Sequence, residues 1–155
     1  MLVRTHRNGD IPDISRLYYD TIHRINSNDY TREQVDAWAP EIPDVDFWRE
    51  RFRKYHVYVA EEGARIVGFT ELDPNGHIDC FFVHHAWQRR GIGTRLMERV
   101  VETAVRDSIA RLFAEVSITA EPFFRGHGFA VTRENEIVRR GVPLRQYLME
   151  RWLEP

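Results

Sequence analysis

The sequence predicts one mixed α/β domain over residues 1–155, built around a mostly antiparallel twisted sheet with helices on both faces. Three observations support this prediction. Apolar residues follow a helical period in some segments and alternate in others, so both helices and strands are expected. Short glycine-containing turns separate consecutive strand-like segments, which favours antiparallel pairing. The length of 155 residues and a hydrophobic content of 43% suit a single globular domain.

The N-terminal third is predicted to contain one strand and three helices. The segment LVRTHR, residues 2–7, starts with alternating apolar residues and is predicted as a strand. Asp10 is the expected N-cap of the first helix. The second helix is expected to begin at Thr31, because its hydroxyl and Gln34 have the spacing of a capping box. The segment DVDFWRERFRKY, residues 44–55, is predicted as a third, short helix.

Three strand-like segments follow, at residues 56–62, 65–73 and 76–84. The turns between them contain Gly63 and the DPNG sequence at residues 73–76, which are typical turn residues. Because the turns are this short, we expect the three strands to form an antiparallel meander.

The last part of the chain is predicted to begin with an amphipathic helix that opens near Gly91. A strand at residues 111–118 and a short helix at 119–128 come next. The chain then ends in an antiparallel pair of strands at residues 129–138 and 144–153. The expected order is one strand, three helices, three strands, a helix, a strand, a helix and two strands.

The composition limits the partners and the location. Acidic residues outnumber basic residues by 24 to 22, and the formal net charge is −2, which argues against a protein built to hold a nucleic-acid backbone. Cys80 is the only cysteine, so no intrachain disulfide is expected. The start of the chain lacks the apolar stretch of a signal peptide, and no apolar run approaches the roughly 18 residues of a membrane span. We expect a cytoplasmic monomer or homodimer without a membrane or nucleic-acid partner.

A metal site is not expected either. His84 and His85 are adjacent, and adjacent residues of a strand point to opposite faces. No further group of potential ligands has a suitable spacing.

The segment QRRGIGT, residues 88–94, joins a predicted strand to a predicted helix and is suited to bind an anion. A helix N-terminus has unpaired N–H groups and a partial positive charge, and glycines allow close approach to its backbone. Two nucleotide-binding motifs do not fit. The third glycine of the dinucleotide fingerprint is replaced by Leu96, and the sequence of a phosphate-binding P-loop is absent.

The strand CFFV at residues 80–83, followed by the segment at 88–94, resembles the acetyl-CoA motif [Q/R]-x-x-G-x-[G/A] of the GNAT superfamily of N-acetyltransferases. The segment SITAEPFFRGHGF, residues 117–129, resembles a second stretch of this family, and the element order resembles the family fold. The residues SITAEPFF at 117–124, together with residues 30–40 and 139–151, are also similar to a bacterial subgroup of small GNAT enzymes without an assigned acceptor.

The resemblance implies an acetyl-CoA site at a splay between two strands. The strand ending at Val83 would offer backbone groups to the pantetheine arm, the amides of residues 89–94 would hold the pyrophosphate, and the helix near residue 124 would flank the donor. The implied contacts are Phe81, Phe82, Val83, Gln88, Arg89, Arg90, Gly91, Ile92, Gly93, Thr94, Ser117, Phe123, Phe124 and Arg125.

The chemistry then requires a general base, because an amine attacks a thioester only in its neutral form. Without a bulge, strand alternation places His77, Asp79, Phe81 and Val83 on one face. We favour Asp79 as the base, then Glu71, then His77, which lies where some family members carry a glutamate.

Two further roles are open. A backbone N–H near Phe82 or Val83 is the expected donor to the oxyanion. Many family members have a tyrosine that protonates the leaving thiolate where this chain has Phe124, and often an asparagine where it has Ser117. Tyr147 is the alternative acid.

The acceptor site is expected between the early helices and the last strand pair. Tyr30 and Trp38 are the expected acceptor-binding residues, because aromatic rings suit a small apolar amine and can hold a cation. The sequence therefore predicts an acetyl-CoA-dependent N-acetyltransferase for a primary amine of a small molecule. A transferase for protein N-termini or lysines, and a non-catalytic acyl-CoA-binding sensor, are the alternatives.

Overall fold

The computed structural model describes residues 1–154, and within them the order of strands and α-helices is the predicted one. Short 3-10 turns at Asn8–Asp10, Asn26–Asn28 and His85–Trp87 join some elements. The strands are β1 (Leu2–Thr5), β2 (His56–Glu62), β3 (Arg65–Leu72), β4 (Ile78–Val83), β5 (Arg111–Ser117), β6 (Ala130–Arg139) and β7 (Val142–Trp152). The helices are α1 (Ile11–Arg24), α2 (Arg32–Trp38), α3 (Val45–Phe52), α4 (Ile92–Arg106) and α5 (Glu121–Gly126).

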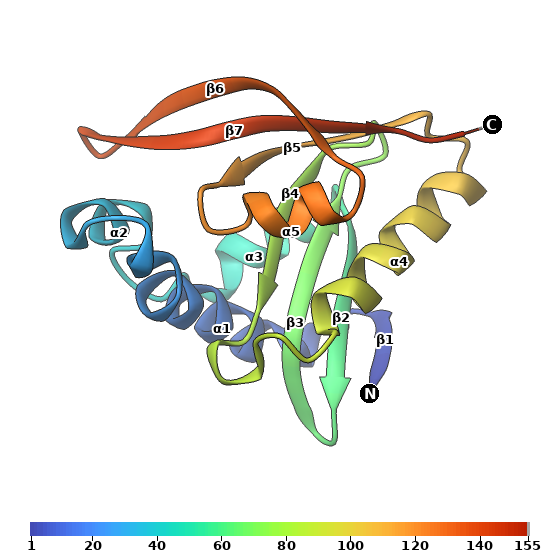
Figure 1. Ribbon diagram of the computed structural model, residues 1–155. Coiled ribbons are helices and arrows are strands. Elements are labelled where there is room, and N and C mark those ends of the chain that lie inside the picture. Colours follow the sequence, from blue (N-terminus) through green and yellow to red (C-terminus); the bar gives the residue numbers. More distant parts are fainter. Residues whose placement is uncertain (155) are drawn as a thin grey trace.

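The strands form two antiparallel sheets, in the orders β1-β2-β3-β4 and β5-β7-β6. The sheets join where β4 and β5 begin. There, His77 and Phe113 form one parallel bridge, and the Phe113 N–H donates to the Gly76 carbonyl oxygen at 3.1 Å. Beyond this point β4 and β5 diverge (Figure 1). This divergence is the strand splay that the family resemblance implied.

Helices cover both faces of the first sheet. Ile14 of α1 and Trp48 of α3 share a buried cluster with Val59 of β2. Leu96 of α4 shares another cluster with Ala60, the next residue of β2. Because successive strand residues point to opposite faces, α1 and α3 lie on one side of the sheet and α4 on the other. None of the helices within residues 1–154 is long and apolar enough to cross a membrane.

Two predicted helix caps have different outcomes. The capping box is confirmed: Thr31 Oγ1 accepts from the Gln34 N–H at 3.1 Å, and Gln34 Oε1 accepts from the Thr31 N–H at 2.8 Å. Asp10 does occupy the predicted N-cap position of α1, but its side chain makes no cap hydrogen bond to that helix. Both Asp10 oxygens accept from Arg4, at 2.8 and 3.0 Å. A two-pronged guanidinium contact is stronger than a single bond to a backbone N–H.

Strand β4 contains a bulge at Asp79 and Cys80. Between the paired residues on either side of them, β3 contributes one residue and β4 contributes two. As a result Ile78 and Phe81, three positions apart, pack against the same buried cluster. A bulge re-aims side chains in this way, and such features are common next to binding sites.

The bulge changes which residues share a face. The sequence places His77, Asp79, Phe81 and Val83 on one face only if no bulge intervenes. Phe81 and Val83 do pack together, in the cluster on the α4 side. Asp79 instead contacts Arg51 of α3, on the other side of the sheet.

The join between the two sheets yields a stability prediction. Gly76 has φ of +99°, and a Cβ atom there would lie 2.0 Å from the Arg111 carbonyl oxygen. We expect Gly76→Ala to lower the free energy of unfolding by about 3 kcal/mol or more, measured by urea denaturation. Gly63, with φ of +63° and open space around it, is the control, for which Ala costs about 1 kcal/mol. Equal losses would contradict this account of the junction.

Candidate active site

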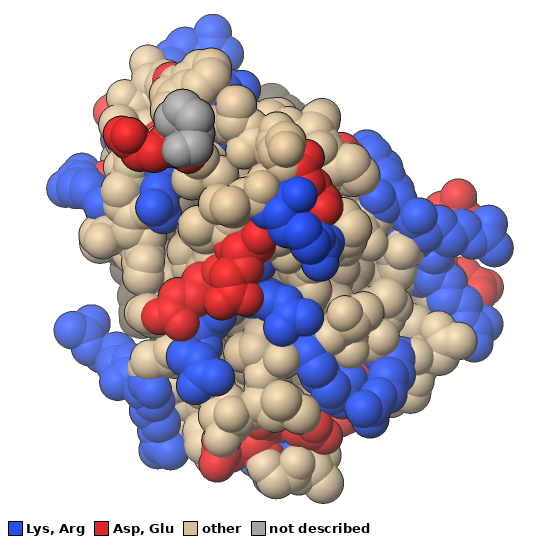
Figure 2. Space-filling view, turned by 90° about the vertical axis from the view of Figure 1, so that its right-hand side faces the viewer, with Lys and Arg blue, Asp and Glu red and all other residues tan. Residues whose placement is uncertain are grey.

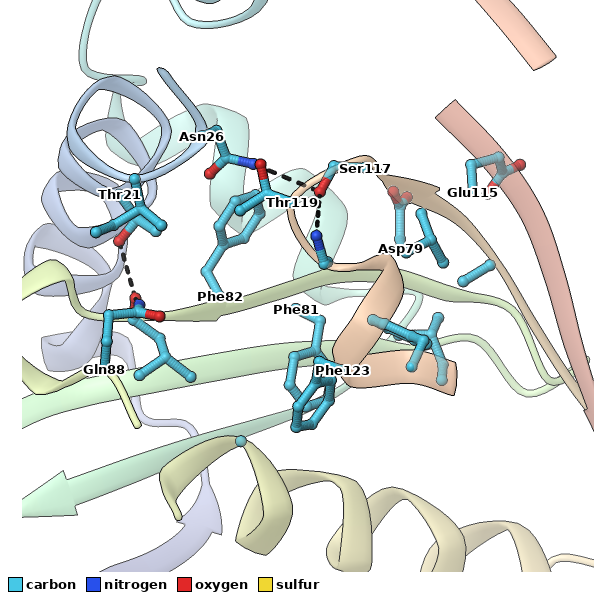
Figure 3. A pocket seen from close by; sticks show the side chains of 18 of the residues that line it. Thr21, Asn26, Asp79, Phe81, Phe82, Gln88, Glu115, Ser117, Thr119 and Phe123 are labelled. Carbon is cyan, nitrogen blue, oxygen red and sulfur yellow. Dashed lines mark hydrogen bonds between the residues drawn. The ribbon is translucent and has the colours of Figure 1, made fainter. Parts of the chain in front are cut away.

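Two cavities meet in the gap between β4 and β5. The β4–β5 cavity, of about 200 Å³, extends from β4 to β5, α5 and the start of α4 (Figure 3). The β6–β7 cavity, of about 550 Å³, lies between β6, β7 and helices α1 to α3. The residues that line both are Trp38, Asp79, Phe82, Glu115 and Ser117. A group bound in one cavity can therefore contact a group bound in the other at this junction.

The free edge of β4 forms one wall of the β4–β5 cavity. The His84 N–H bonds to the Val67 carbonyl of β3 at 2.8 Å. Because bonding alternates along an antiparallel strand, the amide of Phe82 also faces β3, whereas that of Val83 faces the splay. Thr21 Oγ1 and Gln88 Nε2 donate to the Val83 carbonyl, at 3.1 and 2.7 Å, on this open side. Of the two amides considered as oxyanion donors, only that of Val83 faces the cavity.

The loop before α4 leaves its backbone accessible. Gly91 is the N-cap of α4 with φ of +80°, provides no side-chain cap, and has open space where a Cβ would stand. The first amides of a helix have no intrahelical acceptor, so those of Ile92 to Thr94 are directed outward. Arg89 and Arg90 are exposed, and the Arg90 guanidinium lies 4.8 Å from the centre of the Trp87 ring.

Helix α5 closes the other side of the β4–β5 cavity. The Phe123 ring lies 5.2 Å from that of Phe81. A Cβ at Gly93 would lie 2.8 Å from Phe123, so this glycine allows α4 and α5 to approach. Phe124 is buried and also lines the cavity. Arg125 is exposed, pairs with Glu121 of the same helix, and lies away from the cavity lining.

The turn after β5 contributes two hydroxyl groups to this cavity. Ser117 Oγ accepts from the Ala120 N–H at 3.1 Å and lies 3.5 Å from Asn26 Nδ2 (Figure 3). Thr119 Oγ1 is buried and has no hydrogen-bond partner within residues 1–154. Such an orphaned group is uncommon and is a candidate ligand contact. The sequence analysis missed Thr119, because nothing local distinguishes it from a turn residue.

Asp79 lies where the two cavities meet and is held from α3. Its Oδ2 atom is 2.8 Å from Arg51 Nη2 and accepts from the Tyr55 hydroxyl at 2.7 Å. Burial by itself would raise the pKa of Asp79, but the charge of Arg51 and the bond from Tyr55 outweigh it and lower that pKa. The carboxyl group is therefore ionised at neutral pH.

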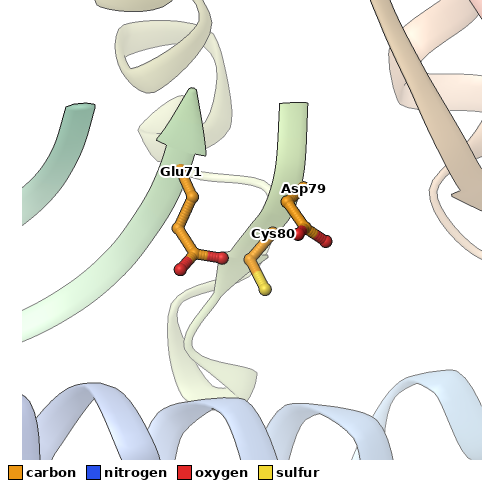
Figure 4. A group of neighbouring side chains, drawn as sticks. All are labelled: Glu71, Asp79 and Cys80. Atoms are coloured by element: carbon orange, nitrogen blue, oxygen red, sulfur yellow. The ribbon is translucent and has the colours of Figure 1, made fainter. Parts of the chain in front are cut away.

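Glu71 is fully buried, and Arg51 binds both of its oxygens, at 2.7 and 3.1 Å. In the described part of the chain it lines neither cavity. Glu71, Asp79 and Cys80 bring potential metal ligands within 4.8 Å of one another (Figure 4). Arg51 Nη2 also approaches Cys80 Sγ, at 3.7 Å. A guanidinium thus takes the cation position among these three groups.

His77 pairs with Glu115 across the start of the splay, with 2.5 Å between Nε2 and Oε2. The hydrogen bond to Glu115 raises the pKa of His77, and the same contact lowers that of Glu115. His77 also lies on the ring of Phe113, 5.1 Å away. Glu115 was missed in the sequence, where it is one of several charged residues on a strand.

The remaining predicted residues are placed as follows. Tyr30 and Trp38 line the β6–β7 cavity with ring centres 5.6 Å apart. The Tyr30 hydroxyl donates to the Arg145 carbonyl at 2.6 Å and accepts from the Ile118 N–H at 2.9 Å, so it holds β7 to the turn after β5. Tyr147 packs against the core cluster near α5 and lines neither cavity in the described chain.

The charged surface away from the cavities is mixed in sign. On the side formed by α4 and the end of β7, arginines are interspersed with acidic residues (Figure 2). Such a surface does not produce an extended positive field on this side of the molecule.

The His77–Glu115 pair leads to a pH-dependent prediction. In wild type, the stability from protonated His77 is complete below its unfolded pKa near 6.5 and is lost as the pH rises through its higher folded pKa. We expect Glu115→Gln to lower the pKa of His77, because only burial and more distant charges then act on it. An NMR titration of the ring, assigned with His77→Gln, measures this. An unchanged pKa would show that Glu115 does not control the histidine.

Comparison with known proteins gives the same family as the sequence resemblance. The family model described as Acetyltransferase (GNAT) domain matches residues 26–151. The chain is 29% identical over 147 residues to the uncharacterized N-acetyltransferase YafP of Escherichia coli strain K12, which covers 95% of this chain and 93% of YafP.

Solved structures share the fold. A GCN5-related N-acetyltransferase of Rhodopseudomonas palustris superimposes with a TM-score of 0.92 and 25% identity, covering 98% of this chain and 95% of the other. YncA of Salmonella typhimurium, solved with its cofactor acetyl-CoA, has a TM-score of 0.74 and 22% identity, covering 100% of this chain and 95% of YncA.

Proposed function

Since the chain belongs to the acetyltransferase (GNAT) family, we propose that it transfers the acetyl group of acetyl-CoA to a primary amine of a small molecule. The observation that carries this proposal is the junction of two cavities at Asp79. One cavity has the open strand edge and helix N-terminus suited to a nucleotide thioester. The other, with aromatic walls and about 550 Å³, has the size of a small-molecule pocket.

Acetyl-CoA supplies an acetyl group that is activated as a thioester. The residues present fit this donor: the amides of Ile92 to Thr94 and the charge of Arg89 and Arg90 suit a pyrophosphate. The free edge of β4 at Val83 suits the amide groups of a pantetheine arm, which can bind as an added strand does. YncA, which has the same fold, contains acetyl-CoA, and this supports the assignment.

Asp79 is assigned to accept a proton from the amine. An alkylamine has a pKa near 10.4 and must lose a proton before it attacks. Its lowered pKa makes Asp79 too weak a base to deprotonate an ammonium ion, so that first proton is lost to solvent. Because Arg51 and Tyr55 keep Asp79 ionised and fixed, its carboxylate can accept a hydrogen bond from the neutral amine and then the proton that is released as the C–N bond forms and the nitrogen becomes acidic. His77 is less suited, since its partner Glu115 favours the protonated ring.

Thr119 is assigned as a hydrogen-bond donor to the bound thioester. Phe124 has no group that donates, and Tyr147 lies outside the cavity lining. The Thr119 hydroxyl lies at the wall of the β4–β5 cavity and has no partner within residues 1–154. Donation to the developing negative charge would satisfy this group and favour the reaction.

The donor site is tested with two variants of Gly91 that match in shape. Asn and Asp tolerate left-handed backbone better than other side chains, so both variants suit φ of +80° at this position. We expect Gly91→Asp to bind acetyl-CoA at least about tenfold more weakly than Gly91→Asn in calorimetric titration, because its carboxylate repels the pyrophosphate. The added charge favours the N-terminus of α4, so weaker binding does not reflect unfolding. Equal affinities would place the pyrophosphate elsewhere.

Catalysis is tested by Asp79→Asn, using the best acceptor from a panel of small alkylamines that carry an aromatic ring, with and without a carboxylate. We expect kcat/KM to fall on the order of 10²- to 10⁴-fold while the Kd of acetyl-CoA is unchanged. His77→Gln is the comparison and should lose less. A larger loss in His77→Gln would move the base to the histidine. Tight binding without turnover across the panel would favour the non-catalytic alternative.

A further inference from the structure

One wall of the β6–β7 cavity is formed by alternate residues of β6. Arg133, Asn135, Ile137 and Arg139 line the cavity, and the even-numbered residues between them do not. Side chains of a strand alternate between faces, so these four point to the cavity side of the sheet. The sheet register continues this face into Gln146 of β7, which pairs with Asn135.

Some of the basic side chains that line this cavity are paired with carboxylates, and others are not. Near the junction with the β4–β5 cavity, Arg51 is paired with Glu71 and Asp79. His77 is paired with Glu115. The arginines of β6 differ, because neither has an acidic group within 4.0 Å among residues 1–154.

The two β6 arginines lie at different distances from the junction. Arg133 is in register with Leu148, which is in register with Glu115 of β5. Arg139 is six residues further along β6, about 20 Å in an extended strand. Its charge acts on the hydroxyl of Tyr18. Burial and Cys80 raise the pKa of this hydroxyl, and the positive charge of Arg139 reduces the rise. Two exposed arginines without an acidic partner in the described chain therefore line the cavity that Asp79 also lines.

We propose that the acceptor amine carries an anionic group, which Arg133 or Arg139 binds while the amine lies at Asp79. This inference rests on the proposed function and names the chemical class of its substrate: an amino acid or a similar amine with a carboxylate or phosphonate. The rest of the cavity suits an aromatic or apolar side chain, because Tyr18, Phe47 and Phe82 also line it. Guanidinium groups bind carboxylate and phosphate oxygens through paired, charge-assisted hydrogen bonds.

A peptide N-terminus differs from such a substrate in one respect. The group next to its amine is a neutral amide, which offers the arginines no charge. The distinction between a free amino acid and a protein N-terminus can therefore be measured by changing one functional group.

The test uses bisubstrate analogues in which the sulfur of CoA is joined through a CH₂–CO bridge to an amine. The three amines are phenylalanine, phenylalaninamide and the phosphonate analogue of phenylalanine. Binding to the full chain is measured by calorimetry, so turnover is not required. We expect the carboxylate analogue to bind about tenfold more tightly than the amide, with the advantage falling as salt rises. The phosphonate shows which anionic group is preferred.

Three variants with equal change of charge locate the contact. Arg133→Gln and Arg139→Gln remove the proposed groups. Arg32→Gln is the control, because the Arg32 side chain is exposed on α2 and lines neither cavity in the described part of the chain. The preference for the carboxylate should shrink in at least one of the first two variants and persist in Arg32→Gln.

Each outcome decides the matter. If the amide binds as tightly as the carboxylate in wild type, or if the preference survives both β6 variants, the inference is overturned. Equal binding of the amide would instead favour a protein N-terminus as acceptor. If free CoA itself does not bind, the proposed function fails and the substrate assignment fails with it. Binding of CoA with no gain from any of the analogues overturns the substrate assignment alone.

Discussion

The pairing of β4 with β5 stops after the single bridge between His77 and Phe113, and the site depends on the unpaired edge that follows. Backbone groups inside a protein need hydrogen-bond partners. The carbonyl of Val83 finds them in Thr21 and Gln88, two side chains that come from α1 and from the loop before α4. Its amide has no strand beside it. The fold therefore leaves a backbone N–H without a strand partner, where the pantetheine arm would complete the pairing under the proposed function.

A second constraint is the guanidinium of Arg51. Glu71 is fully buried, and an unpaired charge at such a depth would be strongly destabilising. Arg51 neutralises it and, from the same position, contacts Asp79 at the junction of the cavities. The bulge at Asp79 and Cys80 makes this possible, because it turns Asp79 toward α3. The group that stabilises the core thus also keeps the proposed base ionised, so the acidity of the site is set by the packing of α3.

The sequence was sufficient for features that depend on local periodicity and spacing. The order of elements and the Thr31 cap follow from such patterns. Features that depend on contacts between distant segments were missed. Asp10 has the local signature of a cap but binds Arg4 of β1, and the bulge at Asp79 leaves no signature in a run of strand-forming residues. The partners of Asp79 and His77 come from α3 and β5, so no spacing along the chain could identify Arg51 or Glu115.

The two-sheet architecture separates the parts that would bind the two substrates. The donor cavity is built from β4, α4 and α5, whereas β6 and β7 form the wall of the other cavity and carry the charge of Arg133 and Arg139. Because side chains alternate along β6, a substitution at Arg133, Asn135, Ile137 or Arg139 changes that wall without entering the buried core of the α4 side. The order β5-β7-β6 also places β6 at the edge of its sheet, where it supports only one neighbouring strand. Under the proposed function, acceptor preference can therefore change through β6 while Asp79, Val83 and the α4 loop keep their geometry.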